Sequence, residues 1–588
     1  MCGIIGYIGN NNASPILFQS LKRMEYRGYD SAGIATINDN ELIVRKDIGR
    51  IDQINEKIKF DTAKGKIGIA HTRWATHGAV TIENSHPHVS CNEEIAIVHN
   101  GIIDNYTQLR EELSTKHNFK SETDTEIIAH LIEEEYAKRK EPIETLKYVS
   151  DKLTGSFALV VIFKDHVNEI YGVRKYAPLI IGKGKKENFI ASDVVSFIDY
   201  TDNVIFLEDK EIAKVTINSV KIINFDGKEI KRGVTHVAWE AADISKEEFS
   251  HHTLKEIHEQ NSTINMALKQ DKVGFNNFIK ELTSGKNIFI TGSGSSYHIA
   301  LIFRNMLTRF AKISAQAFLS SEADEYSELM DDNSILIPIS QSGETADLLE
   351  AIRKVKNKGV KILSIYNTVG SSLSRMSDLN MNLNCGPEIG VAATKSFTAQ
   401  LAIVYKIIFN LCQMENGDKK LEGLSSNIKE VLDIKKSLHQ IIEVLNESND
   451  VYFLGRSIHH PIALEGALKL KELAYIHAEG MAAGELKHGT LALVEEGTPA
   501  IIINPMDETY RDTISNAIEM KSRGAKIIGI SSTNNEVYDY WIKIPEVDNS
   551  IYPIIEIIPL QLLAYFTAIR RKNNPDYPRN LAKSVTVK

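Results

Sequence analysis

The sequence predicts an α+β domain followed by two α/β domains with parallel, doubly wound sheets. In the first part of the chain, short β-rich runs such as EIAIVHN (94–100) and FALVVIF (157–163) are separated by polar turns, which is typical of antiparallel sheets. Two helical patterns, 13–26 and 123–139, interrupt these runs. After residue 285 strands alternate with helices, and this alternation indicates parallel sheets.

The α/β part of the chain contains an internal repeat. Three segments, 287–301, 334–345 and 357–365, recur as 450–464, 499–509 and 522–530, at offsets of 163, 164 and 165 residues. A nearly constant offset indicates two copies of one doubly wound unit. We therefore expect domains at 2–240, 285–415 and 445–578, a linker with leading helices at 241–284 and a C-terminal tail at 579–588.

Composition excludes several classes of protein. The chain has 588 residues, a formal net charge of −9, 43% hydrophobic and 25% charged residues, the balance of a soluble globular protein. The acidic charge argues against a nucleic-acid-binding protein. The four cysteines form no disulfide framework and match no zinc spacing.

Neither end of the chain predicts a targeting or membrane segment. The N-terminus lacks the pattern of a secretory signal. The apolar stretch 551–569 carries Glu556 and two prolines, which makes it a poor membrane span. We expect a cytoplasmic enzyme.

Cys2 is the first residue with candidate chemistry. A small second residue lets the initiator methionine be removed, which leaves cysteine at the mature N-terminus. Its α-amine, with an ordinary pKa of about 7.7–8.0, then suits the role of general base toward its own thiol. The alternative is that Cys2 is merely the second residue of the chain.

Five motifs resemble those of the N-terminal-nucleophile glutamine amidotransferases. They are MCGIIGYIG (1–9), EYRGYDSAGIA (25–35), HTRWATHG (71–78), HNGIIDNY (99–106) and SETDTE (121–126). Their residue types suit the chemistry: Arg73 can grip a carboxylate with two parallel hydrogen bonds, and Asp124 can hold an α-ammonium group. The side-chain amide of Asn100 and the backbone N–H of Gly101 can form an oxyanion hole.

A group of histidines close in sequence offers a different interpretation, a metal site. The residues are His71, His77, His86, His88 and His99. No carboxylate or cysteine completes a recognisable ligand spacing among them, so the amidotransferase interpretation is favoured.

Two loops of the first α/β repeat are candidate phosphate sites, TGSGSSYH (291–298) and SQSGET (340–345). Each follows a strand and opens a helix, where backbone N–H groups and hydroxyls attract phosphate at the sheet edge that binds ligands. Neither is a Walker A or dinucleotide motif, and the alternative is a pair of ordinary turns with capping serines. In the second repeat Asp507 stands in the equivalent loop and would repel a phosphate, which indicates another task for that copy.

The segment 461–478 of the second repeat predicts a largely apolar helix that begins with proline. Glu465, Lys469 and Glu472 fall on one face at i, i+4 and i+7. They form either a solvated salt bridge or, if the helix is buried, a charged stripe that faces a cavity or partners.

Two further residues near the C-terminus have candidate chemistry. His488 lies in a glycine-flanked turn, where an imidazole can reach a substrate. Lys583 lies among small and apolar residues, and a desolvated lysine is a candidate for Schiff-base formation with a carbonyl.

Over its full length the chain resembles the glutamine–fructose-6-phosphate aminotransferase (isomerizing) family, also called glucosamine-6-phosphate synthases. The most specific strings are ISQSGETADLLEAI, EIGVAATKSFT, ALEGALKLKELAYIHAEG, GELKHG and RNLAKSVTV. The family joins a class II glutamine amidotransferase domain to two SIS (sugar isomerase) domains. The resemblance implies conversion of L-glutamine and D-fructose 6-phosphate to D-glucosamine 6-phosphate and L-glutamate, the first committed step of UDP-N-acetylglucosamine synthesis.

The resemblance also implies roles for individual residues. Cys2 is the expected nucleophile, the oxyanion hole consists of Asn100 and Gly101, and glutamine binds to Arg73, Thr76, His77, Gly101 and Asp124. Trp74 is the expected gate of an internal ammonia channel. The sugar phosphate binds to Ser296, Ser340, Gln341, Ser342 and Thr345. Glu472 moves a proton between two sugar carbons, His488 assists ring opening, and Lys583 forms the imine with the sugar.

The resemblance implies no metal and no organic cofactor. It implies a homodimer, because the counterpart of His488 in the family reaches the neighbouring subunit's site. The chain lacks the long glutaminase insertion of larger relatives, which favours a bacterial-type enzyme without feedback control by the nucleotide sugar. Two residues depart from the family pattern: Ala393 stands where serine is frequent, and Asn261 stands where proline is usual.

Two other functions fit paired SIS domains, a fructosamine-phosphate deglycase and a sugar-phosphate sensor. A deglycase has no need of Cys2. A sensor has no need of Glu472, His488 and Lys583 together, and it would usually carry a DNA-binding segment.

Overall fold

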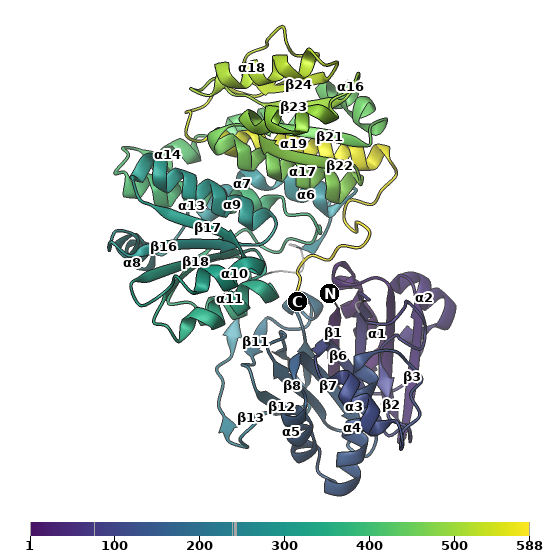
Figure 1. Cartoon of the computed structure of the whole chain (residues 1–588). Coiled ribbons are helices and arrows are strands. Elements are labelled where there is room, and N and C mark those ends of the chain that lie inside the picture. The colour runs from purple at the N-terminus through teal and green to yellow at the C-terminus, as the bar shows by residue number, and fades with distance from the viewer. Residues whose placement is uncertain (1, 76, 238, 240–243, 587–588) are drawn as a thin grey trace. The chain divides into compact units, whose positions relative to one another are not determined.

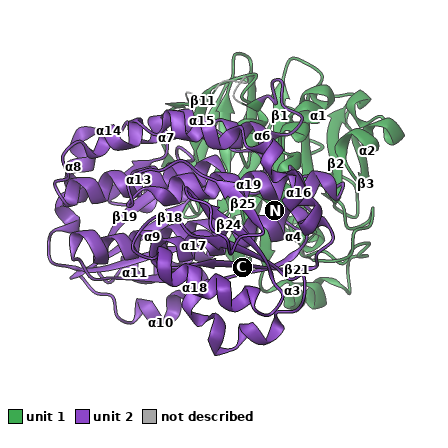
Figure 2. Cartoon of the chain, turned by 90° about the horizontal axis from the view of Figure 1, so that it is seen from above, with its two compact units in different colours: residues 1–244, 582–588 green, residues 245–581 purple. Residues whose placement is uncertain are grey.

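The computed structural model describes residues 2–75, 77–237, 239 and 244–586. The chain divides into two compact units, residues 1–244 together with 582–588, and residues 245–581 (Figure 2). The first unit contains the predicted α+β part and the second contains the α/β repeats, so the predicted fold class is confirmed.

Two antiparallel sheets form the centre of the first unit (Figure 1). In the described residues, one sheet has the strand order β15-β11-β9-β10-β1-β4-β2-β3 and the other β14-β13-β12-β8-β7-β6-β5. The first sheet consists of β1 (Gly3–Gly9), β2 (Ser31–Asn38), β3 (Glu41–Ile48), β4 (Ile67–Arg73), β9 (Ile180–Lys183), β10 (Glu187–Ala191), β11 (Asn203–Phe206) and β15 (Thr235–His236). The second consists of β5 (His88–Val89), β6 (Ile95–Ile103), β7 (Gly155–Phe163), β8 (Ile170–Lys175), β12 (Glu211–Val215), β13 (Val220–Asn224) and β14 (Glu229–Ile230).

The two sheets pack face to face through apolar side chains. Ile4 of β1, Ile69 of β4, Val98 of β6 and Val160 of β7 are buried in one cluster. Gly6 of β1 permits the close approach, since a Cβ at that position would lie 3.1 Å from Cγ1 of Val160. Because successive residues of a strand point to opposite faces, the outer face of each sheet is left for helices.

Helices cover these outer faces. Helix α1 (Ala13–Arg23) packs on β1 and β4 through Leu17 and Leu21. Helices α3 (Tyr106–Leu113), α4 (Asp124–Arg139) and α5 (Pro142–Lys152) share a core with the second sheet, and α2 (Ile51–Ile58) packs on β3. Every residue of β1 is therefore buried, with α1 on one face and the second sheet on the other.

The second unit contains two five-stranded parallel sheets with the same topology, β17-β16-β18-β19-β20 and β22-β21-β23-β24-β25. The first consists of β16 (Asn287–Gly292), β17 (Ala315–Leu319), β18 (Ser334–Ser340), β19 (Lys361–Tyr366) and β20 (Leu379–Asn382). The second consists of β21 (Asp450–Gly455), β22 (His477–Ala482), β23 (Pro499–Ile503), β24 (Lys526–Ser531) and β25 (Tyr540–Lys543). The matched segments of the sequence begin equivalent strands, so the predicted repeat is confirmed.

The helices of this unit follow and connect the strands. They are α6 (His252–His258), α7 (Gln260–Ala267), α8 (Lys272–Leu282), α9 (Ser295–Met306), α10 (Ala323–Ser327), α11 (Ala346–Lys356), α12 (Ser372–Met376), α13 (Lys395–Leu411), α14 (Gly417–Glu422), α15 (Ser425–Leu432), α16 (Lys435–Asn446), α17 (His460–Ala474), α18 (Tyr510–Lys521) and α19 (Tyr552–Arg570). Phe303 of α9, Tyr405 of α13, Leu470 of α17 and Leu563 of α19 belong to one buried cluster. The two repeats therefore share one apolar cluster, and each has a further cluster on the other face of its sheet.

The apolar stretch 551–569 forms α19, the one helix in the described residues that is long and apolar enough to cross a membrane. Within this unit 89% of its apolar window is buried, and the helix packs on α17. The apolar character of α19 is thus accounted for by its place in the core.

Candidate active sites

Cys2 lies beside the end of β4. The antiparallel register pairs Gly3 with Thr72. Cys2, the residue just before β1, therefore lies next to Arg73 and Trp74. The backbone N–H of Trp74 donates to the Cys2 Sγ at 3.4 Å, and the thiol lies 3.6 Å from the carbonyl oxygen of Trp74, to which it can donate. Burial raises the pKa of the Cys2 thiol above its ordinary value. A thiol in this state needs a base before it attacks.

The side-chain amide of Asn100 is turned toward Cys2. Its Nδ2 donates to the carbonyl oxygen of Cys2 at 3.0 Å. Nε2 of His71 contacts Oδ1 of Asn100 at 3.1 Å and the carbonyl oxygen of His99 at 3.0 Å. Because both partners are acceptors, this ring nitrogen carries the proton. Burial lowers the pKa of His71 to about 3, so the ring is neutral at physiological pH and holds the Asn100 amide in one orientation.

Gly101 follows Asn100 at a position that only glycine fits. Its φ is +136°, a region that L side chains rarely adopt, and a Cβ would lie 1.9 Å from the carbonyl oxygen of Ser156. The two predicted oxyanion donors, Asn100 and Gly101, therefore occupy the part of β6 that contacts Cys2.

Arg73 and Asp124 lie in the same site. The buried guanidinium of Arg73 donates to the carbonyl oxygens of Ala79 and Gly78, each at 3.1 Å. Asp124, the first residue of α4, accepts from the N–H of Ile103 at 2.9 Å. Burial lowers the pKa of Arg73, and the nearby acidic groups Cys2, Asp30 and Asp124 oppose that shift. The predicted binders of a carboxylate and of an ammonium group are thus gathered around the thiol.

The other predicted residues of this site are less completely defined. The ring of His77 contacts that of Tyr106, with centroids 5.7 Å apart. Trp74 is half-buried. It is therefore not the fully buried side chain expected if Trp74 were a core residue instead of a channel gate. Thr76 lies outside the described residues.

The five histidines that suggested a metal site are held by other contacts. His71 stacks on His86 with centroids 4.1 Å apart, and His86 Nδ1 accepts from the N–H of His99 at 3.3 Å. His88 Nε2 lies 3.1 Å from Oγ1 of Thr123. In the described part of the chain these histidines do not converge as metal ligands.

Asp30 has a role that the sequence analysis did not identify. Its carboxylate accepts from the N–H of Ala75 at 2.8 Å, and its own N–H donates to the carbonyl oxygen of Arg73 at 2.9 Å. It therefore fixes the chain on both sides of Trp74. The motif EYRGYDSAGIA (25–35) contained this residue but gave no reason to single it out.

The two candidate phosphate loops lie side by side in the second unit. Strands β16 and β18 are neighbouring and parallel, with Thr291 opposite Pro338, so the loops at their carboxyl ends share one edge of the sheet. Oγ of Ser340 accepts from the N–H of Gly343 at 3.0 Å and lies 3.3 Å from Oγ1 of Thr345. Of the other predicted residues, Ser296 is buried and contacts Gln400, while Gln341 and Ser342 are half-buried.

The Glu465–Lys469 pair of the charged stripe is buried and Glu472 is 21% exposed, so the solvated salt bridge is the wrong interpretation. The side chains of Glu465 and Lys469 are 0% exposed, and Nζ of Lys469 lies 3.3 Å from Glu465 and 2.6 Å from Glu472. Burial alone would lower the pKa of Lys469, but its attraction to the two carboxylates outweighs burial and raises that pKa.

The stripe also joins the two repeats. Oγ of Ser295 donates to Glu465 at 2.8 Å, and Nδ1 of His298 lies 2.6 Å from the same carboxylate. Ser295 and His298 belong to α9, the helix that the first phosphate loop opens. The helix that carries Glu472 is therefore anchored to the phosphate-loop helix.

The equivalent loop of the second repeat is part of the core. The Asp507 carboxylate lies 2.9 Å from Nε2 of His459, whose Nδ1 lies 3.0 Å from Glu556. The three side chains are 0% exposed. Burial disfavours the charged form of His459, but the two carboxylates outweigh burial and raise its pKa to about 9. Asp507 thus belongs to a buried ionic cluster.

The catalytic roles of His488 and Lys583 stay predictions. His488 ends a 3₁₀ helix (Ala483–His488) and is exposed. Lys583 is half-buried and belongs to the segment Ala582–Lys588, which groups with the first unit.

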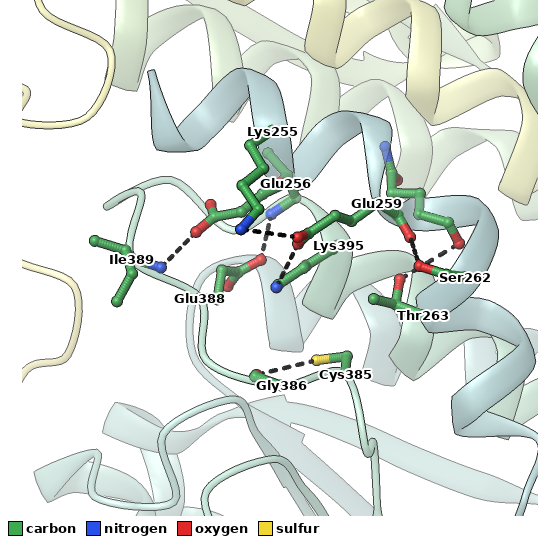
Figure 3. A network of polar contacts seen from close by, with 12 residues as sticks. Lys255, Glu256, Glu259, Ser262, Thr263, Cys385, Gly386, Glu388, Ile389 and Lys395 are labelled. Carbon is green, nitrogen blue, oxygen red and sulfur yellow. Dashed lines mark hydrogen bonds and ion pairs between the residues drawn. The ribbon is translucent and has the colours of Figure 1, made fainter. Parts of the chain in front are cut away.

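A polar network joins α6 and α7 to the segment 385–395 (Figure 3). Glu256 accepts from the N–H of Gly390 at 3.1 Å, and Nζ of Lys395 lies 2.6 Å from Glu259. Glu388 accepts from the N–H of Ser396 at 3.0 Å. These contacts fix a segment without regular secondary structure that leads into α13.

The two departures from the family pattern fall beside this network. Ala393 is half-buried within the same segment. Asn261 is the second residue of α7, in the first turn, where the backbone N–H that proline lacks has no helical partner.

Comparison with protein families identifies the two parts of the chain. A model described as "Glutamine amidotransferase domain" matches residues 71–199, and one described as "SIS domain" matches residues 281–409 and 444–571. The chain is therefore a glutamine amidotransferase domain followed by two SIS domains.

Relatives of known name cover the whole chain. It is 44% identical to the glutamine–fructose-6-phosphate aminotransferase (isomerizing) of Thermococcus kodakarensis and 43% identical to that of Pyrococcus horikoshii, over 100% of each chain. The solved C-terminal domain of glucosamine-fructose-6-phosphate aminotransferase from Francisella tularensis is 33% identical, with a TM-score of 0.51, and matches 56% of this chain and 99% of that one. The chain belongs to the glutamine–fructose-6-phosphate aminotransferase (isomerizing) family.

The buried stripe gives a prediction about stability. Lys469→Ala removes the buried ammonium group that pairs with Glu465 and leaves that carboxylate with its contacts to Ser295 and His298. We expect the free energy of unfolding to fall by about 3 kcal/mol, the lower end of the loss when one member of a buried ion pair is removed. Urea denaturation measures this loss, and Lys471→Ala, an exposed position of the same helix, is the matched control. Equal stability of the two variants would contradict the prediction.

Proposed function

We propose that the chain converts L-glutamine and D-fructose 6-phosphate to D-glucosamine 6-phosphate and L-glutamate. The observation that carries the proposal is the 3.0 Å contact between the Asn100 amide and Cys2 in a chain of this family. The adjacent loops 291–298 and 340–345 support the sugar half of the reaction. A deglycase or a sensor has no use for the arrangement around Cys2.

In the glutaminase half, the α-amine of Cys2 takes the thiol proton after the initiator methionine is removed, and Sγ attacks the γ-carbonyl carbon of glutamine. Asn100 and Gly101 donate to the oxyanion. The C–N bond then breaks as the amine returns the proton to the leaving nitrogen, which releases ammonia and leaves a thioester. Water hydrolyses the thioester to glutamate. The contacts of Asn100 and the backbone conformation of Gly101 support these roles.

Substrate recognition in this half rests on opposite charges. Arg73 binds the α-carboxylate of glutamine and Asp124 binds its α-ammonium group. Thr76 and His77 complete the site in this proposal. The proximity of Arg73 to both Cys2 and Asp124 supports the first two assignments, because it places them in one site beside the nucleophile.

In the sugar half, the phosphate group is bound by the hydroxyls, amide and backbone of the two loops, namely Ser296, Ser340, Gln341, Ser342 and Thr345. His488 assists the opening of the sugar ring. Nζ of Lys583 condenses with the C2 carbonyl to an imine with loss of water, and ammonia then displaces the lysine. Glu472 moves a proton from C1 to C2, which produces the amino aldose. The buried contacts that anchor the helix of Glu472 support a fixed position for this carboxylate.

The two reactions need a protected route for ammonia. Ammonia released into water at neutral pH becomes ammonium, which is not a nucleophile, whereas a closed apolar passage keeps it neutral and at a high effective concentration. Trp74 follows the Arg73 that binds the glutamine carboxylate, so its ring is suited to gate such a passage when glutamine is bound. We further infer a cytoplasmic homodimer in which His488 acts in the neighbouring subunit's site.

One assay tests the proposed reaction. Glutamine and fructose 6-phosphate mixed with the protein should yield glutamate and glucosamine 6-phosphate in equal amounts. Cys2→Ala removes the nucleophile and should abolish both products from glutamine, and Cys412→Ala, a half-buried thiol in the second unit, is the control that keeps them. Glutaminase activity that survives in Cys2→Ala would refute the N-terminal nucleophile.

In the sugar half, imine formation and phosphate binding are assigned to different residues, and this gives a second prediction. Lys583→Ala removes the imine-forming amine, so synthesis should stop while glutamine hydrolysis persists. Ser340→Ala combined with Thr345→Ala should instead weaken sugar binding, by about 1.5–3 kcal/mol for each lost hydrogen bond to the phosphate, with chemistry retained at saturating sugar. Steady-state measurement of both products separates the two cases. Normal synthesis by Lys583→Ala would show that the imine role is wrong.

Trp74 gives a third prediction, about coupling. If Trp74 is the gate, Trp74→Ala folds and still makes glutamate, but the ratio of glucosamine 6-phosphate to glutamate falls well below one. A core tryptophan would instead cost about 3–5 kcal/mol of folding free energy on truncation, with both activities lost together. Product ratios together with thermal unfolding decide between the two, and a ratio of one in a folded Trp74→Ala would contradict the gate.

A further inference from the structure

Four side chains at the edge of the amidotransferase domain converge on one point. They are Cys91 in the turn between β5 and β6, His117 after α3, and His130 and Glu133 on α4. One ligand atom of each lies within 4.8 Å of the others. This cluster is separate from the five histidines near Cys2 and has no part in the proposed reaction.

Four of the six distances between ligand atoms match the edges of a metal tetrahedron, and the other two are below 4.8 Å. The Cys91 Sγ lies 3.4 Å from Nδ1 of His117 and 3.5 Å from Nδ1 of His130. Oε2 of Glu133 lies 3.3 Å from the same nitrogen of His117 and 3.6 Å from that of His130. Zinc bound by sulfur at about 2.3 Å and by nitrogen or oxygen at about 2.0 Å gives tetrahedral edges of about 3.3–3.6 Å.

The second layer of the cluster supports the same interpretation. Nε2 of His130 lies 3.6 Å from Glu126, and Nε2 of His117 lies 3.7 Å from Glu134. Each imidazole therefore turns one nitrogen to the cluster and the other toward a carboxylate just beyond hydrogen-bond distance. A small shift of either side chain would give the hydrogen bond that orients metal-bound histidines. The Glu133 carboxylate also accepts from the N–H of Cys91 at 2.9 Å, which fixes the turn that carries the thiol.

We propose that Cys91, His117, His130 and Glu133 bind one Zn²⁺ ion with a structural role. One thiolate and one carboxylate balance the charge of the ion, and four protein ligands leave no open position for substrate. The ion would clamp the turn at Cys91 and the segment after α3 onto α4. The sequence shows no zinc spacing because the ligands come from three separate segments, with only His130 and Glu133 close together at i, i+3.

Zinc analysis of the full chain tests the proposal. The protein is prepared under reducing conditions in the Cys2→Ala background, because the N-terminal amine and thiol of Cys2 can themselves chelate zinc. We expect about one zinc per chain, lost in Cys91→Ser and in His117→Gln. The controls Cys412→Ser and His477→Gln, at a half-buried and an exposed position of the second unit, should keep the metal.

Two further measurements distinguish the loss of a metal ligand from the misfolding of a variant. Cobalt(II) added to the metal-free protein should give the visible spectrum of a tetrahedral site with a thiolate-to-cobalt band, and that band should be absent in Cys91→Ser. Chelation should lower the thermal unfolding temperature of the parent but not of Cys91→Ser, which circular dichroism can show to be folded. Zinc content and cobalt spectra equal in the parent and in both ligand variants would overturn the proposal.

Discussion

The register between β1 and β4 decides where Cys2, the proposed nucleophile, lies. Pairing of Gly3 with Thr72 brings Cys2 beside Arg73 and Trp74, and the second sheet then brings Asn100 against the same residue. A shift of one residue would turn every side chain of β1 to the opposite face. Because α1 and the second sheet bury both faces of this strand, such a shift is excluded, and the thiol is held by the packing of the domain.

The two repeats of the second unit share one strand order but differ in the loops after equivalent strands. Both repeats have the same strand order, but the loop after β18 keeps hydroxyls and a glycine, whereas the loop after β23 places Asp507 against His459 and Glu556 in the interior. The second repeat contributes α17, whose buried charges reach the loop helix of the first. A buried charge is costly unless it is paired, so this contact holds the two repeats in one arrangement.

Much of the irregular chain around both candidate sites is held by single side chains. Asp30 fixes the backbone around Trp74, and Glu256 and Glu388 fix the segment before α13. The cluster of Cys91, His117, His130 and Glu133 is a further case, in which a metal ion would hold three segments together. In each case a buried or half-buried carboxylate supplies the hydrogen bonds that a helix or sheet would otherwise provide.

The sequence by itself determined the fold class, the internal repeat and the family, because periodicity and motifs are local properties of the chain. For the charged residues of α17 the sequence left two alternatives, a solvated salt bridge and a buried stripe. The burial of Glu465 and Lys469 in the structure decided for the buried stripe. The role of Asp30, the orientation of Asn100 by His71 and the convergence of Cys91, His117, His130 and Glu133 came only from the tertiary structure. These features join residues from different strands and turns, and the distance between such residues is set by how the sheets and helices pack, which no local spacing in the sequence encodes.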